Sequence, residues 1–227
     1  MRKILVAALL LGACGPAMAS TVVFDNPSNF AQGDCSYSTT CAADVGRGDD
    51  FAAQLFTLSS GVTLTGGSVT NFMDPSQSGA NPTSINWKFL AADGLGGLPG
   101  TSLFSGSSVV TSHDSVGSLF GFYDASKSSF ALPNVSLAAG NYYFAVQAVS
   151  GVFQTYLSQG VLPGGAAESF DGGASWNFGY ENLPSVAVSL SSGGAVPEPA
   201  SWAMMLGGFG AIGGAMRARR KAAVSFA

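Results

Sequence analysis

Few side chains in this chain have the types and spacing that chemistry requires, and the most closely grouped are three carboxylates. Asp44, Asp49 and Asp50 are interleaved with Gly46 and Gly48. Hard cations bind clustered oxygen ligands, so this segment is a candidate calcium loop, although its spacing does not fit an EF-hand. The alternative is a solvated turn. The sequence suggests no other cofactor.

The residue types used in hydrolysis are scarce. His113 is the only histidine, and its neighbour Asp114 would point to the opposite side of a strand, so the two do not build a serine triad. We expect His113 in a surface loop. Glu168 and Glu181 are the only glutamates before residue 198, and both lie near turn signals, which disfavours paired-acid glycoside hydrolysis. The sequence therefore predicts a protein that is not an enzyme.

Aromatic side chains are the remaining candidates for ligand contact. Trp176 and Tyr180 follow a Gly-rich turn and are candidates for stacking on sugar rings, because aromatic faces pack on the apolar faces of pyranoses. For Trp176 the alternative is core packing. Trp87 alternates with Ile85 and Phe89, so we expect it in the core.

The N-terminus has the three parts of a secretory signal peptide. Arg2 and Lys3 precede a short apolar run, and Ala17-Met18-Ala19 precedes Ser20. We therefore expect export and cleavage after Ala19, which assigns residues 1–19 to the signal peptide. A lipobox-like segment ending at Cys14 leaves lipidation of that cysteine as the alternative.

Export leaves Cys35 and Cys41 as the cysteines of the mature chain. In an oxidising compartment an even pair of nearby cysteines favours a disulfide, which would close a small loop. The alternative is two free thiols in a flexible loop.

The C-terminus combines a short motif, an apolar run and a basic cluster. Pro197, Glu198 and Pro199 are followed by Trp202 and Ala203. Residues 200–216 carry no charge and would form a helix of about 25 Å, at the short end for a membrane span. Residues 217–227 include four basic side chains and would stay in the cytoplasm by the positive-inside rule.

This tail resembles the PEP-CTERM sorting signal in its PEP-x-x-W-A variant. The resemblance implies recognition by an exosortase-type membrane protease and removal of the helix near Pro197–Pro199. It also implies delivery to the cell surface or extracellular matrix, often alongside exopolysaccharide production. The motif residues are then features of a substrate and have no catalytic role.

Residues 20–192 have the pattern of an all-β domain, with residues 193–199 as a linker that contains the motif. Ile85–Phe89, Tyr142–Val149 and Ser185–Leu190 alternate with period two, which is typical of strands packed on one side. Turn signals separate the segments, and we expect a β-sandwich of jelly-roll type. Further predicted strands are Thr21–Asp25, Phe51–Leu58, Val62–Phe72, Ser102–Phe104, Ser118–Tyr123, Phe130–Val135 and Phe153–Leu157.

Three phrases, Trp87–Gly106, Phe130–Gln147 and Glu168–Trp176, together resemble a β-sandwich module recurrent in secreted bacterial proteins with such tails. The resemblance implies the fold and leaves the ligand open.

The charge of the central domain excludes one class of partner. Between residues 20 and 196 there are three basic and twelve acidic side chains, a net charge of −9. Such a domain repels nucleic acid. We therefore expect an exported cell-surface or extracellular protein, anchored transiently in the inner membrane, with a structural or adhesive role linked to exopolysaccharide. The alternative is a carbohydrate-binding module without catalysis.

Overall fold

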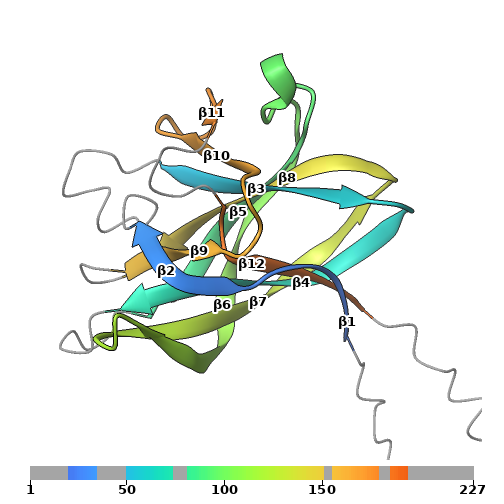
Figure 1. Cartoon of the computed structure of the whole chain (residues 1–227). Coiled ribbons are helices and arrows are strands. Elements are labelled where there is room, and N and C mark those ends of the chain that lie inside the picture. The colour runs from blue at the N-terminus through green and yellow to red at the C-terminus, as the bar shows by residue number, and fades with distance from the viewer. Residues whose placement is uncertain (1–19, 35–49, 74–80, 151–154, 179–184, 194–227) are drawn as a thin grey trace, which may run out of the picture. The chain divides into compact units, whose positions relative to one another are not determined.

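Strands make up nearly all the regular structure in the part of the chain that the structure describes (Figure 1). The computed structural model describes residues 20–34, 50–73, 81–150, 155–178 and 185–193. Within these ranges there are twelve strands and one 3₁₀ turn, η1 (Leu95–Gly97), so the all-β prediction is confirmed. The strands are β1 (Ser20–Asn26), β2 (Ser28–Asp34), β3 (Phe51–Leu58), β4 (Val62–Met73), β5 (Ser84–Ala91), β6 (Ser102–Leu119), β7 (Tyr123–Leu137), β8 (Gly140–Val149), β9 (Thr155–Gly160), β10 (Ala166–Ser169), β11 (Asn177–Phe178) and β12 (Val188–Gly193).

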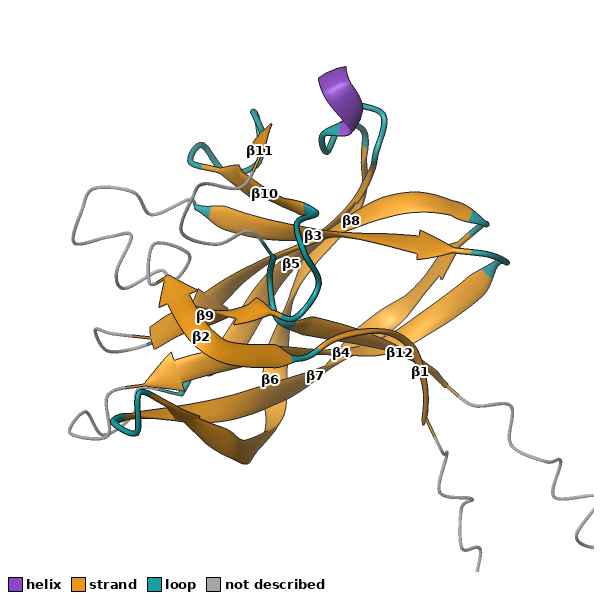
Figure 2. Ribbon diagram, viewed as in Figure 1, coloured by secondary structure: helices purple, strands orange, loops and turns teal. Residues whose placement is uncertain are grey.

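The strands pair into one antiparallel sheet that curls on itself (Figure 2). Its order is β1-β12-β4-β7-β6-β5-β8-β3-β10-β11, and β9 joins β2 to β4. Strand β6 links the two halves, because its first part pairs with β5 and its second part with β7. The register of β6 against β7 shifts between Val110 and Ser112 and again between Ser115 and Gly117. Bulges of this kind bend a strand, which lets the sheet turn back on itself.

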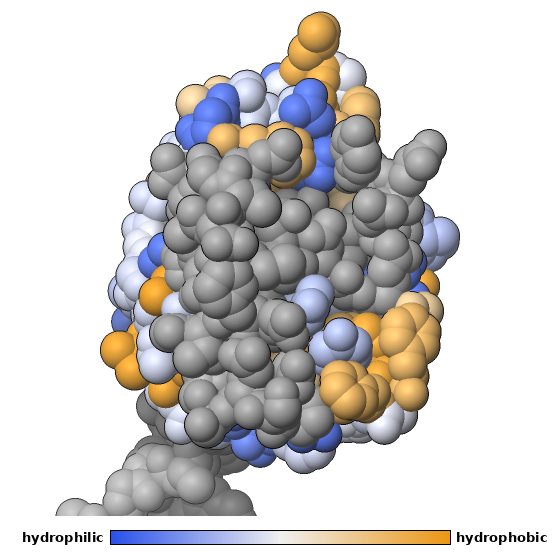
Figure 3. Space-filling model, turned by 90° about the vertical axis from the view of Figure 1, so that its left-hand side faces the viewer, coloured by the Kyte–Doolittle hydropathy of each residue, from blue (hydrophilic) through white to orange (hydrophobic). Residues whose placement is uncertain are grey.

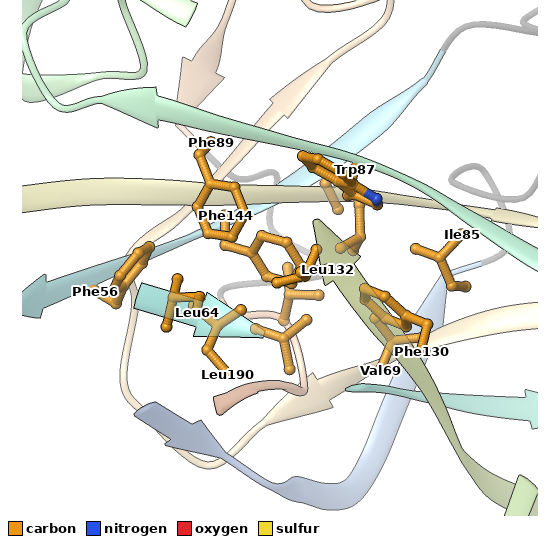
Figure 4. Packing of buried hydrophobic residues seen from close by; sticks show 14 of the residues in the cluster. Phe56, Leu64, Val69, Ile85, Trp87, Phe89, Phe130, Leu132, Phe144 and Leu190 are labelled. Atoms are coloured by element: carbon orange, nitrogen blue, oxygen red, sulfur yellow. The ribbon is translucent and has the colours of Figure 1, made fainter. Parts of the chain in front are cut away.

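The main core lies between the two halves of the sheet (Figure 4). The rings of Phe144 on β8 and Phe89 on β5 stack with their centroids 4.8 Å apart. Phe130, from β7 in the other half, lies 6.4 Å from Phe144. Trp87 is 3 % exposed and its indole donates a hydrogen bond to Ser108 Oγ at 2.9 Å, so its predicted place in the core is confirmed. The finer assignment to a jelly roll stays a prediction.

One predicted strand is wrong. Ser118–Tyr123 contains the turn that joins β6 to β7, and the Phe122 N–H closes it on the Leu119 carbonyl at 3.1 Å. Phe120 and Gly121 have φ values of 56° and 68°, in the left-handed region. Glycine adopts this region at no steric cost, and the pair reverses the chain. The aromatic residues around the turn gave the segment the composition of a strand.

The two terminal segments that the sequence assigns to sorting, residues 1–19 and 194–227, lie outside the described residues. Among the residues that are described, no helix is long and apolar enough to cross a membrane.

Candidate functional site

A second apolar cluster covers the outer face of β3, β8 and β5, on the side away from the main core. Successive side chains of a strand point to opposite faces, so Phe144 enters the core while its neighbour Tyr143 enters this outer cluster. Phe51 and Leu90 are buried in the same cluster, and Trp176 packs against it. Two loops, residues 92–101 and 170–176, supply the cover.

The first loop, residues 92–101, is closed by Asp93. The Asp93 carboxylate accepts hydrogen bonds from the Thr101 hydroxyl and the Thr101 N–H, both at 2.7 Å. These bonds favour the charged form and lower the pKa of Asp93. A Cβ atom at Gly100 would collide with this carboxylate, so the turn requires glycine there. The loop is therefore held by its own residues.

The Tyr143 side chain and the backbone of Asn141 tie the first loop to the sheet. The Tyr143 hydroxyl donates to the Gly97 carbonyl at 3.1 Å, and burial raises the pKa of this phenol. The Ala92 N–H donates to the Asn141 carbonyl at 3.3 Å. Leu95, in η1, is 94 % exposed, and Figure 3 shows an apolar projection at the top of the molecule, where η1 lies.

The second loop, residues 170–176, is ordered by Asp171. Its carboxylate accepts from the Ser175 hydroxyl at 2.5 Å and from the Ser175 N–H at 2.9 Å. The Ser169 hydroxyl and the Ala174 N–H donate to the same group, at 2.8 and 3.0 Å. These bonds, the Ser175 hydroxyl first among them, lower the pKa of Asp171 to about 2. Asp171 therefore caps the turn, as is common for aspartate in Gly-rich segments.

Lys88 fastens this second loop to the strands beneath it. Its ammonium donates a hydrogen bond to the Gly172 carbonyl. It also lies 4.8 Å from the centroid of the Phe51 ring, a cation–π arrangement. Because Lys88 belongs to β5, the turn is connected to the middle of the sheet.

A shallow depression of about 410 Å³ lies between the first loop, the start of β8, Leu55 of β3, Gly165 and Phe178 of β11. Phe178 is 60 % exposed at its rim, and the ring lies 3.7 Å from where a Cβ of Gly96 would be. Asn141 is exposed, and its Oδ1 accepts a hydrogen bond from the Thr57 hydroxyl at 2.8 Å. All the lining side chains are uncharged: Leu55, Ala92, Gly96, Gly97, Asn141, Tyr143, Gly165 and Phe178.

Two of the three sequence phrases noted above line this depression, and the third leads to it. Ala92 and Gly97 belong to the first phrase and Tyr143 to the second, and all three line it. The third phrase, Glu168–Trp176, leads directly into β11 and Phe178. Segments far apart in the sequence thus form one surface.

Of the two aromatic residues predicted to face a ligand, only Trp176 is described. It is partly buried against the outer cluster and does not line the depression. Its indole N–H is buried without a hydrogen-bond partner among the described residues. Core-type packing, the alternative reading, therefore fits Trp176, and Tyr180 lies outside the described residues. Sequence reasoning missed Phe178, whose only signal was its position two residues beyond Trp176.

The predicted calcium loop is described only at its end. Asp50 is fully buried directly before β3, and its carbonyl accepts from Gln147 Nε2 at 3.1 Å, so a solvated turn is wrong for this residue. Asp44, Asp49, Cys35 and Cys41 lie outside the described residues. In the part of the chain that the structure covers, no three His, Cys, Asp or Glu side chains gather in a metal-binding group.

Two candidates for hydrolysis, Glu168 and His113, are described by the structure, and both lie in strands. Glu168 lies inside β10 at 2 % exposure, where residues 166–169 pair with β3, shortly before the turn that Asp171 orders. Glu181 lies outside the described residues. His113 lies on β6 and not in a loop, with Nδ1 3.0 Å from the Ser128 hydroxyl, and partial burial lowers its pKa.

Comparison with known proteins identifies the tail. No curated protein matches the chain. Residues 195–221 match the family model of the PEP-CTERM protein-sorting motif, which contains Pro197, Glu198 and Pro199 as well as Trp202 and Ala203. The chain therefore carries a PEP-CTERM sorting motif, which implies export, membrane-associated sorting and processing by an exosortase-type system.

Proposed function

We propose that this protein is an exported cell-surface or extracellular-matrix component with a structural or adhesive role linked to exopolysaccharide. The observation that carries the proposal is the sorting motif at residues 195–221, joined to an acidic β domain. In this proposal residues 1–19 direct export and are removed. Residues 200–216 then anchor the chain in the inner membrane until an exosortase-type protease cuts near Pro197–Pro199.

The proposed role is not catalytic. The candidates for hydrolysis are scattered, since Glu168 is buried in a strand and His113 lies on β6 beside Ser128. Asp93 and Asp171, whose pKa values are lowered, use their carboxylates to order turns. The hydrogen bonds that order these turns account for the lowered pKa values of both carboxylates.

The test is intact mass measurement and terminal sequencing of the protein recovered from its own cells. We expect a chain that begins at Ser20, ends near Pro197–Pro199 and is found at the surface or in the medium. Replacing Pro197–Pro199 with alanines should leave Trp202–Lys221 attached and the protein in the membrane fraction. Pro163→Ala, at an exposed turn outside the motif, is the control and should be processed normally. Wild-type protein retained in the cytosol would contradict the proposal.

The second candidate function is carbohydrate binding without catalysis. It is favoured by one observation, an uncharged depression with the exposed ring of Phe178 at its rim and the amide of Asn141 in its lining. This function is compatible with the first, because an adhesive matrix protein needs a surface that holds polymer.

A further inference from the structure

We propose that the depression between residues 92–101, the start of β8 and Phe178 of β11 is a subsite for a neutral sugar residue of a glycan. Phe178 stacks on the apolar face of the sugar, and Asn141 donates a hydrogen bond to one of its hydroxyls. The inference rests on the second candidate function and assigns it residues that the sequence did not indicate.

Phe178 has the exposure and fixed position that a stacking platform needs. Strand β11, which carries it, pairs with β10 through Ala167 opposite Phe178 and Glu168 opposite Asn177. The ring is 60 % exposed and lies beside Gly96, which has no side chain to cover it. An apolar ring face that is open to solvent and held by a strand can bind the C–H face of a pyranose at little entropic cost.

Asn141 supplies a polar contact in the same depression. The Thr57 hydroxyl bonds to its Oδ1, which fixes the orientation of the amide. Its Nδ2 has no hydrogen-bond partner among the described residues, so the NH₂ group is available to a ligand. A fixed donor beside an aromatic ring matches a sugar, whose rim carries hydroxyls and whose face carries C–H groups.

The charge of the domain and of the lining favours a neutral glycan over an acidic one. The lining side chains are uncharged, and the domain from residue 20 to residue 196 has a net charge of −9. A field of that sign lowers the local concentration of anionic polymers and leaves neutral chains unaffected. The site therefore favours neutral over acidic polysaccharide.

The loop that lines one side of the depression and the turn that precedes Phe178 are both preorganised. Asp93 closes one loop on Thr101, and Asp171 closes the other on Ser175. Tyr143 and Lys88 bind these loops to β8 and β5. Little ordering remains to be done when a ligand enters, which preserves affinity for a shallow site.

The test uses the protein recovered from its own cells, processed or not, and three kinds of probe. These are the neutral and the acidic fractions of the polysaccharide from the same cells, and the neutral oligosaccharides maltohexaose and cellohexaose. Affinity electrophoresis gives dissociation constants, and NMR follows the side-chain NH₂ of Asn141. We expect binding to at least one neutral probe, weaker binding to the acidic fraction, and a shift of the Asn141 signal.

Substitutions test whether Phe178 and Asn141 form the binding site. Phe178→Leu should weaken binding at least about tenfold, equivalent to about 1.4 kcal/mol, whereas Phe178→Tyr should retain it because the ring face remains. Phe122→Leu is the matched control, since Phe122 is 55 % exposed in the β6–β7 turn, and it should leave affinity unchanged. Asn141→Asp keeps the acceptor for Thr57 but removes the NH₂ donor, so it should also weaken binding.

The possible failures can be told apart. If no neutral probe binds, or if Phe178→Leu and Asn141→Asp bind as wild type, the site is wrong, even where the protein is correctly sorted. Stronger binding to the acidic fraction also overturns it. If the chain is not released near Pro197–Pro199 but binds neutral glycan through Phe178, the site stands and the proposed sorting pathway fails.

Discussion

Asp171 organises the turn before β11 with a single carboxylate, and this makes the stability of the protein depend on acid pH. Its pKa is lowered to about 2 by hydrogen bonds, first from the Ser175 hydroxyl. The unfolded chain binds a proton at this group near the ordinary value of 3.8. The carboxylate therefore contributes its full stabilisation above about pH 4 and loses it as the pH falls through about 2.

We predict that Asp171→Asn lowers stability at about pH 5 and flattens the loss of stability between about pH 4 and about pH 2. The measurement is the denaturation midpoint in urea as a function of pH, for the variant and the wild type. Asp93→Asn provides a comparison, since the pKa of Asp93 is lowered as well. Parallel pH profiles for wild type and Asp171→Asn would show that the carboxylate does not stabilise the folded state in this way.

Phe144 joins the two halves of the sheet within the core. It is fully buried and stacks on Phe89 from its own half and on Phe130 from the other. We predict that Phe144→Ala lowers the free energy of unfolding by about 3–5 kcal/mol, because it removes buried apolar surface and leaves a cavity. Leu95→Ala, at a side chain 94 % exposed, should change it by less than about 0.5 kcal/mol. Equal effects in equilibrium urea unfolding would contradict this account of the core.

The sequence predicted the core residues better than the residues of the candidate site. The alternation around Trp87 predicts its burial because period two within one strand is local information. The arrangement around the depression depends instead on Tyr143, which bonds to Gly97 46 positions earlier in the chain, and on Lys88, which bonds to Gly172 84 positions later. No local pattern states that Phe178 remains open while Trp176 is covered.

At the scale of the strands, β12 and β1 have unequal importance. Strand β12 lies between β1 and β4 and places Leu190, 1 % exposed, in the core. Strand β1 lies at the end of the sheet order, and its Val22 is 61 % exposed. Leu190 therefore excludes more water from the core than Val22 does.

We predict that Leu190→Ala costs about 2–5 kcal/mol of unfolding free energy and that Val22→Ala costs less than about 0.5 kcal/mol. Thermal and urea unfolding of the two variants give the comparison. Should Val22→Ala be as damaging as Leu190→Ala, the exposed position assigned to Val22 on β1 would be wrong.

Strand β6 shows why element lengths were harder to predict than element types. The sequence indicated only Ser102–Phe104 and Ser118–Tyr123, whereas the strand runs from Ser102 to Leu119. Nearly all of its side chains are exposed or partly exposed, so it has no buried face to produce apolar alternation. Its backbone hydrogen bonds to β5 and β7, the strands directly before and after it in the chain, define it instead.

At the scale of the whole domain, the first and last described residues are neighbours. Ser20 pairs with Gly193 across β1 and β12. The predicted signal-peptide cleavage site and the linker to the sorting motif therefore join the domain at the same corner of the sheet. Removing either terminal segment leaves this pairing intact, because both partners belong to the domain.

This pairing predicts that the domain tolerates circular permutation. Directly paired residues have Cα atoms about 5 Å apart, so a linker of about four residues can join Gly193 to Ser20. New ends between Gly121 and Phe122 fall in an exposed turn and break no strand. We expect this permutant to unfold cooperatively, with the near-ultraviolet circular dichroism of the parent domain.

The matched control opens the chain between Ser128 and Ser129, inside β7, where both residues pair with β4 as well as with β6. That permutant should fail to fold, because the break falls in the middle of the strand that joins two parts of the sheet. If the first permutant also fails while the unpermuted domain folds, Ser20 and Gly193 are not neighbours. If both permutants fold equally well, continuity of β7 does not matter to the sheet, and the order β4-β7-β6 must be revised.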